Sequence, residues 1–157
     1  LTNEGRKNAV SVIRKHRLSE MFLSKVMGFG WEEVHDIAEE LEHLKSANFF
    51  DRMDELLGFP NIDPHGSPIP KKNGEIVKSS YKTLAEHAVG TKVELKALRD
   101  SSTDFLVFLN KKEIRLGTEI LIRQIEPFDR TMTISYGNHS EQVLSNSVSS
   151  RLLVEAI

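Results

Sequence analysis

The stretch WEEVHDIAEELEHLK, Trp31 to Lys45, places four possible metal ligands at helical spacing. His35, Glu39, Glu42 and His43 stand at offsets of 0, 4, 7 and 8 residues. On a helix that turns about 100° per residue, these side chains fall within an arc of roughly 100°. If the whole stretch is helical, they share one face.

The same stretch is strongly acidic and has no Lys or Arg before Lys45. Like charges one turn apart destabilise a helix by roughly a few tenths of a kcal/mol. A divalent cation would supply the missing positive charge, and imidazoles and carboxylates are suitable ligands for it. A solvated acidic face opposite an apolar stripe is the competing interpretation. The acids are Glu32, Glu33, Asp36, Glu39, Glu40 and Glu42.

The preceding segment carries another His/Glu pair, because His16 and Glu20 stand one helical turn apart in VIRKHRLSEMFL. Only a short break at Gly28 to Gly30 separates this segment from the acidic stretch. Two helices with so short a connection can fold back as an antiparallel hairpin and bring their ligands together. The two pairs together favour metal binding over a solvated face.

Four motifs occur in order along the chain: LTNEG at 1–5, RKHRLSEMFL at 14–23, HDIAEELEH at 35–43 and DPHGSPIP at 63–70. Together they resemble the central part of the metal-dependent transcriptional repressors of the DtxR/MntR family. The resemblance is specific through Pro70 and looser beyond it. In that family, the LTNEG-like motif directly follows a winged helix-turn-helix. The resemblance therefore implies that the DNA-reading module belongs before Leu1 and is missing from this chain.

Composition agrees with a globular protein that is not built to coat DNA. The 157 residues are 39% hydrophobic and 28% charged, with a formal net charge of -2, and suit one large domain or two small ones. No signal peptide or membrane-spanning run is present, so we expect a soluble, cytoplasmic protein without a membrane partner. The absence of cysteine leaves oxygen and nitrogen ligands for a metal.

Three helices are predicted in the first half of the chain. The first runs from Asn3 to about Met27 after a Thr2 cap, with basic residues on what we interpret as a solvated face without a DNA role. Gly28 and Gly30 end it, the acidic stretch follows, and Ser46 can cap a third helix that ends near Gly58.

The apolar stripes of the second and third helices exceed what three helices can bury among themselves. A second copy of the chain would cover them, and the resemblance also implies a homodimer. Packing on another domain is the alternative. The residues predicted for the dimer seam are Val34, Leu41, Leu44, Phe50, Met53 and Leu57.

The second half of the chain changes to short segments with partial alternation: KVELKALR, EILIRQIEP, MTISYG and EQVLS. Turn residues separate these strands, and Thr103 to Asn110 is expected to form one short helix. A small SH3-like barrel fits, and it resembles the FeoA-like module of the family. The predicted fold is α+β, with a helical domain at 1–72, a linker at 73–82 and the barrel at 83–157.

The resemblance implies a second metal site that fastens the barrel to the helices through Glu20, Asp63, His65 and Asp104. A turn begun by Asp63 and a helix cap at Asp104 are the alternative roles. Glu39 stands where some family members carry a cysteine, so a hard ligand set favours Mn²⁺ over softer metals, with Fe²⁺ as the other choice. The predicted ligands are His16, Glu20, His35, Glu39, Glu42, His43, Asp63, His65 and Asp104.

We therefore expect the metal-sensing and dimerisation portion of a Mn²⁺- or Fe²⁺-dependent repressor of metal uptake. Operator DNA would be a partner only through the missing module. A plain dimerisation scaffold and a carboxylate/His metalloenzyme are the alternatives. An enzyme is not favoured, because no nucleophile elbow or small-molecule substrate site is evident and only His87 and His139 could act as bases in the second half.

Overall fold

The computed structural model describes residues 2–157, which form two compact units, one up to Ser79 and one from Ser80 to Ile157. The division falls inside the segment 73–82 that the sequence assigns to a linker. The boundaries at 72 and 83 themselves stay predictions. No helix among these residues is long and apolar enough to cross a membrane.

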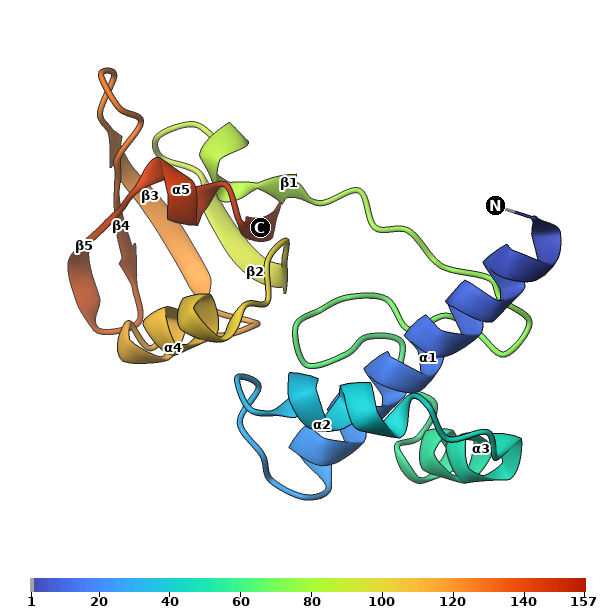
Figure 1. The fold of residues 1–157 in the computed structure, drawn as a ribbon. Coiled ribbons are helices and arrows are strands. Elements are labelled where there is room, and N and C mark those ends of the chain that lie inside the picture. Colours follow the sequence, from blue (N-terminus) through green and yellow to red (C-terminus); the bar gives the residue numbers. More distant parts are fainter. Residues whose placement is uncertain (1) are drawn as a thin grey trace. The chain divides into compact units, whose positions relative to one another are not determined.

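The first unit is built on the long helix α1, Asn3–Lys25 (Figure 1). The Thr2 side chain accepts a hydrogen bond from the Gly5 N–H at 3.0 Å, which confirms the predicted cap. The helix ends before Gly28, whose φ of 76° lies in the left-handed region. Glycine adopts this conformation without a steric penalty, so the predicted stop at Gly28 is also confirmed.

The acidic stretch forms a shorter helix than expected. Helix α2 covers only Val34–Leu41, because the Glu33 carboxylate accepts the Gly30 N–H at 2.7 Å and holds a turn before it. At the other end, the Leu44 N–H donates to the Leu41 carbonyl at 3.0 Å. Glu42 is the C-cap of α2 and lines one hollow with His35 and Glu39, so these three ligands lie together as expected. The expectation that the helix also carries His43 on this face is wrong, since His43 lies in the turn that follows.

Helix α3, Ala47–Leu56, begins at Ser46, whose hydroxyl accepts the Phe49 N–H at 3.3 Å. This confirms the third helix and its cap. Its inner side packs on α1 and on the segment before Pro70, in a cluster formed by Leu18, Phe50, Met53 and Ile69. A second cluster joins Leu23 of α1 to Val34 and Ala38 of α2.

These clusters correct the predicted dimer seam. Val34, Phe50 and Met53 are at most 3% exposed and belong to the interior of the first unit. Because hydrophobic periodicity alone does not tell which apolar face packs within a protomer, the sequence assigned them to the wrong surface.

The second unit is a six-stranded antiparallel sheet in the order β1-β6-β2-β3-β4-β5 (Figure 1). The predicted strands appear as β2 (Lys92–Leu98), β3 (Glu119–Ile125), β4 (Met132–Tyr136) and β5 (His139–Leu144). The predicted short helix is α4, Thr103–Lys111. Alternate residues of the strands, such as Val93, Leu95, Ile120 and Ile122, fill the core.

Four further elements complete this unit. They are β1 (Lys82–Thr83), the 3-10 helix η1 (Leu84–Glu86), α5 (Asn146–Ser149) and β6 (Leu152–Ala156). Strand β6 pairs with both β1 and β2, so the C-terminal end of the chain lies inside the sheet. The helices and the antiparallel sheet together make an α+β protein, as predicted.

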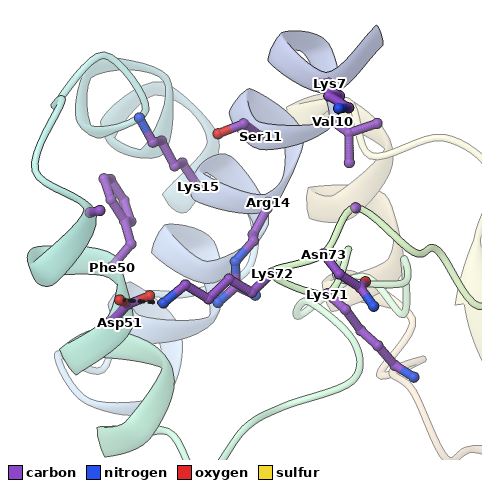
Figure 2. A pocket seen from close by; sticks show the side chains of 12 residues that line it. Lys7, Val10, Ser11, Arg14, Lys15, Phe50, Asp51, Lys71, Lys72 and Asn73 are labelled. Atoms are coloured by element: carbon purple, nitrogen blue, oxygen red, sulfur yellow. Dashed lines mark hydrogen bonds and ion pairs between the residues drawn. The ribbon is translucent and has the colours of Figure 1, made fainter. Parts of the chain in front are cut away.

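The first unit also contains a pocket of about 400 Å³ between α1, the start of α3 and the turn at 71–74 (Figure 2).

Candidate metal centre

Glu20 is the centre of a polar cluster in the first unit. It lies on α1, is 3% exposed, and its Oε1 is 2.8 Å from His16 Nε2 and 3.5 Å from His35 Nδ1. Its Oε2 is 3.3 Å from Nδ1 of His65, which lies on the loop after α3. One buried carboxylate therefore contacts imidazoles from α1, α2 and the loop.

His16 extends this cluster to the end of α2. Its Nδ1 is 2.6 Å from Glu42 Oε2, while its Nε2 contacts Glu20. Since both partners are carboxylates, both ring nitrogens must carry a proton to donate. The hydrogen bond to Glu20 raises the pKa of His16, against the effect of burial, and the carboxylate of Glu42 raises it further.

Asp63 and His65 are held in place by a tight turn. Asp63 Oδ1 accepts hydrogen bonds from the N–H groups of His65 at 2.8 Å and Ser67 at 2.9 Å. The Gly66 N–H donates to the Asp63 carbonyl at 3.0 Å, with a Gly66 φ of 83° that favours glycine. Asp63 thus begins a turn, as the alternative interpretation expects, and the turn also brings it beside Glu20.

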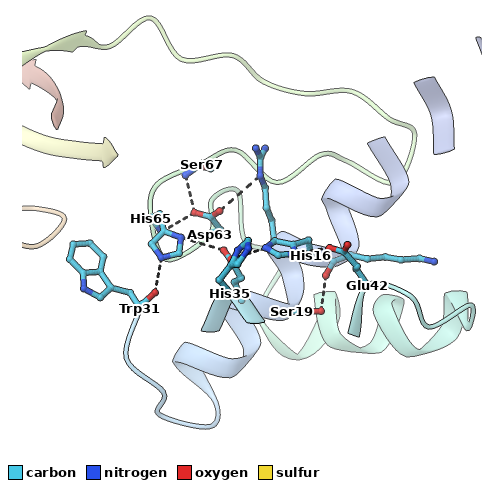
Figure 3. A network of polar contacts seen from close by, with 11 residues as sticks. His16, Ser19, Trp31, His35, Glu42, Asp63, His65 and Ser67 are labelled. Carbon is cyan, nitrogen blue, oxygen red and sulfur yellow. Dashed lines mark hydrogen bonds and ion pairs between the residues drawn. The ribbon is translucent and has the colours of Figure 1, made fainter. Parts of the chain in front are cut away.

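The His65 ring lies between two acceptors. Its Nε2 donates to the Trp31 carbonyl at 2.8 Å (Figure 3). Its Nδ1 faces Glu20. Burial tends to lower the pKa of His65, but the bond to Glu20, the carbonyl of Trp31 and the charge of Asp63 outweigh it, so the pKa is raised.

The two buried acids respond oppositely to this environment. Burial tends to raise the pKa of Glu20, yet its hydrogen bonds with His16 and His65 lower it to about 2. Burial raises the pKa of Asp63 to about 6, because its two backbone hydrogen bonds and the charge of His65 compensate only in part. Although Arg17 Nε lies 4.0 Å from Asp63 Oδ2, an ionised Asp63 is therefore costly to the metal-free fold.

Among residues 2–157, three groups of side chains bring ligand atoms within 4.8 Å of one another. The first is His16, Glu20 and His35, and the second is Glu20, Asp63 and His65, which are all buried. The third is the exposed group of His35, Asp36 and Glu39. Sequence reasoning passed over Asp36 as a ligand, although its spacing of three residues to Glu39 was a usable signal.

The remaining predicted ligands take different places. Glu39 lines a hollow of about 340 Å³ together with His16, His35 and Glu42. The His43 side chain is 77% exposed, with Nε2 4.0 Å from Glu42 Oε1. Asp104 is exposed in the first turn of α4 in the second unit, where Ser102 takes the N-cap position. Its alternative role as the cap is therefore wrong, and its role as a ligand stays a prediction.

The chemistry of these donors fits a hard or borderline divalent cation. Carboxylate oxygens and imidazole nitrogens are ligands of Mn²⁺ and Fe²⁺, and no thiolate is available to favour softer ions. Glu20 and Asp63, each 3% exposed, lie close together in the same interior. Two buried carboxylates repel each other, and a bound cation removes this cost.

Two family descriptions together account for most of the chain. Residues 2–71 match the description "Iron dependent repressor, metal binding and dimerisation domain". Residues 82–156 match the FeoA domain. Residues 72–81, between the two matches, cover most of the predicted linker.

Individual relatives extend this finding. The iron-dependent repressor IdeR of Mycobacterium leprae is 46% identical over 70 residues, which are 45% of this chain and 30% of that protein. The diphtheria toxin repressor of Corynebacterium glutamicum is 31% identical over 131 residues, 76% of this chain and 57% of that protein. This chain thus spans less than two thirds of the length of either relative.

A solved structure matches the whole chain. It is a manganese-dependent transcriptional repressor in complex with manganese, with a TM-score of 0.91 and 30% sequence identity. The match covers 100% of this chain and 74% of that one.

Proposed function

This chain belongs to the DtxR/MntR family of metal-dependent transcriptional repressors, and on that premise we propose that it is the metal-sensing and dimerising portion of a repressor that controls metal uptake. The main support is the position of Glu20, whose two oxygens face His16, His35 and His65. Segments far apart in sequence thereby supply one group of hard ligands. A plain scaffold has no need of such a buried cluster.

We assign the metal ligands to two sites that share Glu20. The first uses α1, α2 and the turn after α2, with His16, Glu20, His35, Glu39, Glu42 and His43. The second uses Glu20 with Asp63 and His65 from the loop. In the metal-free protein, protonated imidazoles supply the positive charge beside the carboxylates. A bound Mn²⁺ or Fe²⁺ would supply this charge instead.

The chain's own residues explain how binding could be transmitted. His16 connects α1 to the end of α2 through Glu42, and His65 connects the loop to the turn before α2 through the Trp31 carbonyl. If His16 and His65 bind an ion in place of these partners, the contacts between α1, α2 and the loop change. An ion shifts a conformational equilibrium only if it binds one arrangement better than the other, and this rearrangement supplies such a difference.

A homodimer is supported by the outer side of α3. Phe49 and Leu56, which are 42% and 75% exposed, stand two helical turns apart and so share one side of the helix. Phe50 and Met53 are buried on the inner side. Leu44 and Phe59, which flank α3, add further exposed apolar surface. We assign the dimer contact to this outer side, in place of the seam predicted from the sequence.

We further propose that the full-length repressor binds operator DNA in the cytoplasm through a segment outside residues 1–157. The lengths of the matched relatives support this assignment, because this chain covers only part of each. The proposal assigns metal binding and assembly, and no catalytic role, to residues 1–157.

Titration calorimetry with Mn²⁺, and with Fe²⁺ under anaerobic conditions, tests the sensing function. We expect saturable binding by the wild type and its loss in Glu20→Gln, which keeps the shape of the side chain and removes its charge. Glu40→Gln is the matched control, since Glu40 is exposed on α2 and lies outside the ligand groups. Equal titrations of the two variants would contradict the proposed centre.

A further inference from the structure

The pocket between α1, α3 and the turn at 71–74 lies apart from the metal centre (Figure 2). No predicted metal ligand is among its described lining residues. Its volume of about 400 Å³ falls within the range of roughly 300–1,000 Å³ that is typical of small-molecule sites. Nothing in the metal-sensing function accounts for this pocket.

The lining of the pocket is strongly basic, although the whole chain has a formal net charge of -2. The charges of its lining side chains leave a formal excess of four positive charges. The basic side chains are Lys7, Arg14, Lys15, Lys71 and Lys72, and the single carboxylate is Asp51.

Three of the five cations already have a carboxylate partner. Arg14 pairs with Asp54 at 2.8 Å, Lys72 with Asp51 at 2.8 Å, and Lys71 with Glu75 at 3.4 Å. These pairs fix two walls of the pocket, one on α3 and one on the 71–75 turn. Among the lining residues of α1, they leave the charges of Lys7 and Lys15 without a carboxylate partner.

Lys7 and Lys15 supply that uncompensated charge. Neither forms an ion pair with a carboxylate of residues 2–157, and Lys15 Nζ donates only to the Leu44 carbonyl, at 2.9 Å. Lys7, Ser11 and Lys15 follow one another at intervals of four residues, so they lie on one face of α1. The exposed Ser11 hydroxyl thus stands between two ammonium groups (Figure 2).

We propose that this pocket binds a phosphate group, held by the Lys7 and Lys15 ammonium groups and the Ser11 hydroxyl. A phosphate carries the multiple negative charge that two unpaired lysines require, and its oxygens accept charge-assisted hydrogen bonds. Asn73, across the pocket, offers an amide donor. Val10 and Phe50, whose ring has Lys15 Nζ above it at 5.4 Å, are the larger apolar lining residues for the rest of a small phosphorylated molecule.

The phosphate group can come from a free small molecule or from a nucleic-acid backbone. A concave site with an apolar wall suits the small molecule better, since backbone phosphates are usually met by exposed side chains. The chemistry that recognises either source is the same.

Titration calorimetry of the metal-free chain with inorganic phosphate and pyrophosphate, in chloride buffer at constant ionic strength, tests the pocket. We expect saturable binding, weakened at least about tenfold in Lys7→Gln/Lys15→Gln and in Lys7→Gln/Ser11→Ala. The second variant leaves the Lys15 contact with Leu44 intact. Lys78→Gln/Lys111→Gln, at exposed positions outside the pocket, removes the same charge and is expected to bind like the wild type.

A parallel titration with short duplex DNA separates the sources. Binding of duplex alone, with loss in the same two pocket variants, assigns the phosphate to a nucleic-acid backbone. The proposal is overturned if neither probe binds, or if the control variant weakens binding as much as the pocket variants. Mn²⁺ titrations of all variants are expected to match the wild type, so this outcome is independent of the proposed metal centre.

Discussion

His16 lies 2.6 Å from Glu42 through Nδ1 and 2.8 Å from Glu20 through Nε2, so a single imidazole joins the end of α2 to the buried carboxylate of α1. Both bonds require the protonated ring. In the metal-free protein, therefore, protonated His16 supplies the positive charge between Glu20 and Glu42. We assign this role to a metal ion in the metal-bound protein.

His16 should contribute more to metal affinity than His43, although the sequence predicts both as ligands. His16 is held between two carboxylates, whereas His43 is 77% exposed and must lose side-chain freedom to bind. We expect His16→Ala to weaken Mn²⁺ binding by at least about tenfold and His43→Ala to weaken it less. Competition with a chelator of known affinity measures both. Equal losses would show that His43 moves fully into the site when metal binds.

Asp63→Asn should stabilise the metal-free protein while weakening metal binding. The asparagine oxygen can still accept the N–H groups of His65 and Ser67, but the buried negative charge is removed. Because the pKa of Asp63 is raised to about 6, its ionised form destabilises the fold near neutral pH, by roughly 1–3 kcal/mol. Urea unfolding at about pH 7.5 measures the gain, which should shrink as the pH falls below 6.

Ser67→Ala is the control for this variant, because it removes a nearby hydroxyl and keeps the Ser67 N–H bond to Asp63. We expect its unfolding free energy to vary with pH as the wild type does. A loss of stability in Asp63→Asn at neutral pH would mean that its charge helps the metal-free fold.

The stability of the metal-free protein should fall as the pH rises above about 6.5. The pKa values of His16 and His65 are raised from 6.5, so the stabilisation from their protons is complete below about pH 6.5 and lost above their folded pKa values. Ionisation of Asp63 adds to the loss between about pH 4 and 6. Glu20 acts in the other direction only at low pH, since its lowered pKa makes its contribution disappear from about pH 4.5 downward.

Far-ultraviolet circular dichroism during urea unfolding, in the presence of a chelator, follows this pH dependence in the helices. We expect Mn²⁺ to reduce the fall or reverse it, since an ion binds the deprotonated imidazoles. A metal-free protein whose stability rises steadily from about pH 6 to 8.5 would contradict the assigned hydrogen bonds.

A charge on the outer side of α3 should disrupt the dimer. Leu56→Asp places a carboxylate on the exposed apolar surface, where burying a leucine otherwise gains about 1.5–3 kcal/mol. Light scattering should show a shift from dimer to monomer. Phe128→Asp is the matched control, because Phe128 is 95% exposed in the second unit and lies outside the assigned contact. A monomeric wild-type protein in light scattering would contradict the assigned dimer contact.

The helices and strands could be predicted well where local signals decide them. Thr2 and Ser46 cap helices, Gly28 ends one, and alternating residues predict β2 to β5. Strand β6 was harder to predict, because Leu152 to Ala156 pairs with β1 and β2 from much earlier in the chain. Such long-range pairing leaves little local signal.

The candidate metal centre shows the same limit. The sequence spacing alone was enough to predict that His16 lies near Glu20 and His35 near Glu39, since each pair lies within a single helix. Spacing alone did not show that Glu20 lies between two groups of ligands, because that depends on how the loop after α3 packs. His43 lies outside helix α2, in the turn after Leu41. The helix is shorter than predicted because the Glu33 carboxylate accepts the Gly30 N–H before it and Ser46 caps α3 soon after it.

Trp31 is the only tryptophan of the chain, and its indole stacks beside the His65 ring with centroids 6.1 Å apart and planes inclined by 27°. The tryptophan fluorescence of the protein therefore comes from a single site next to one of the assigned ligands. A protonated imidazole quenches a neighbouring indole, and so does a paramagnetic ion. The emission of Trp31 should thus follow the state of His65 directly, which provides an optical signal for the loop without any added label.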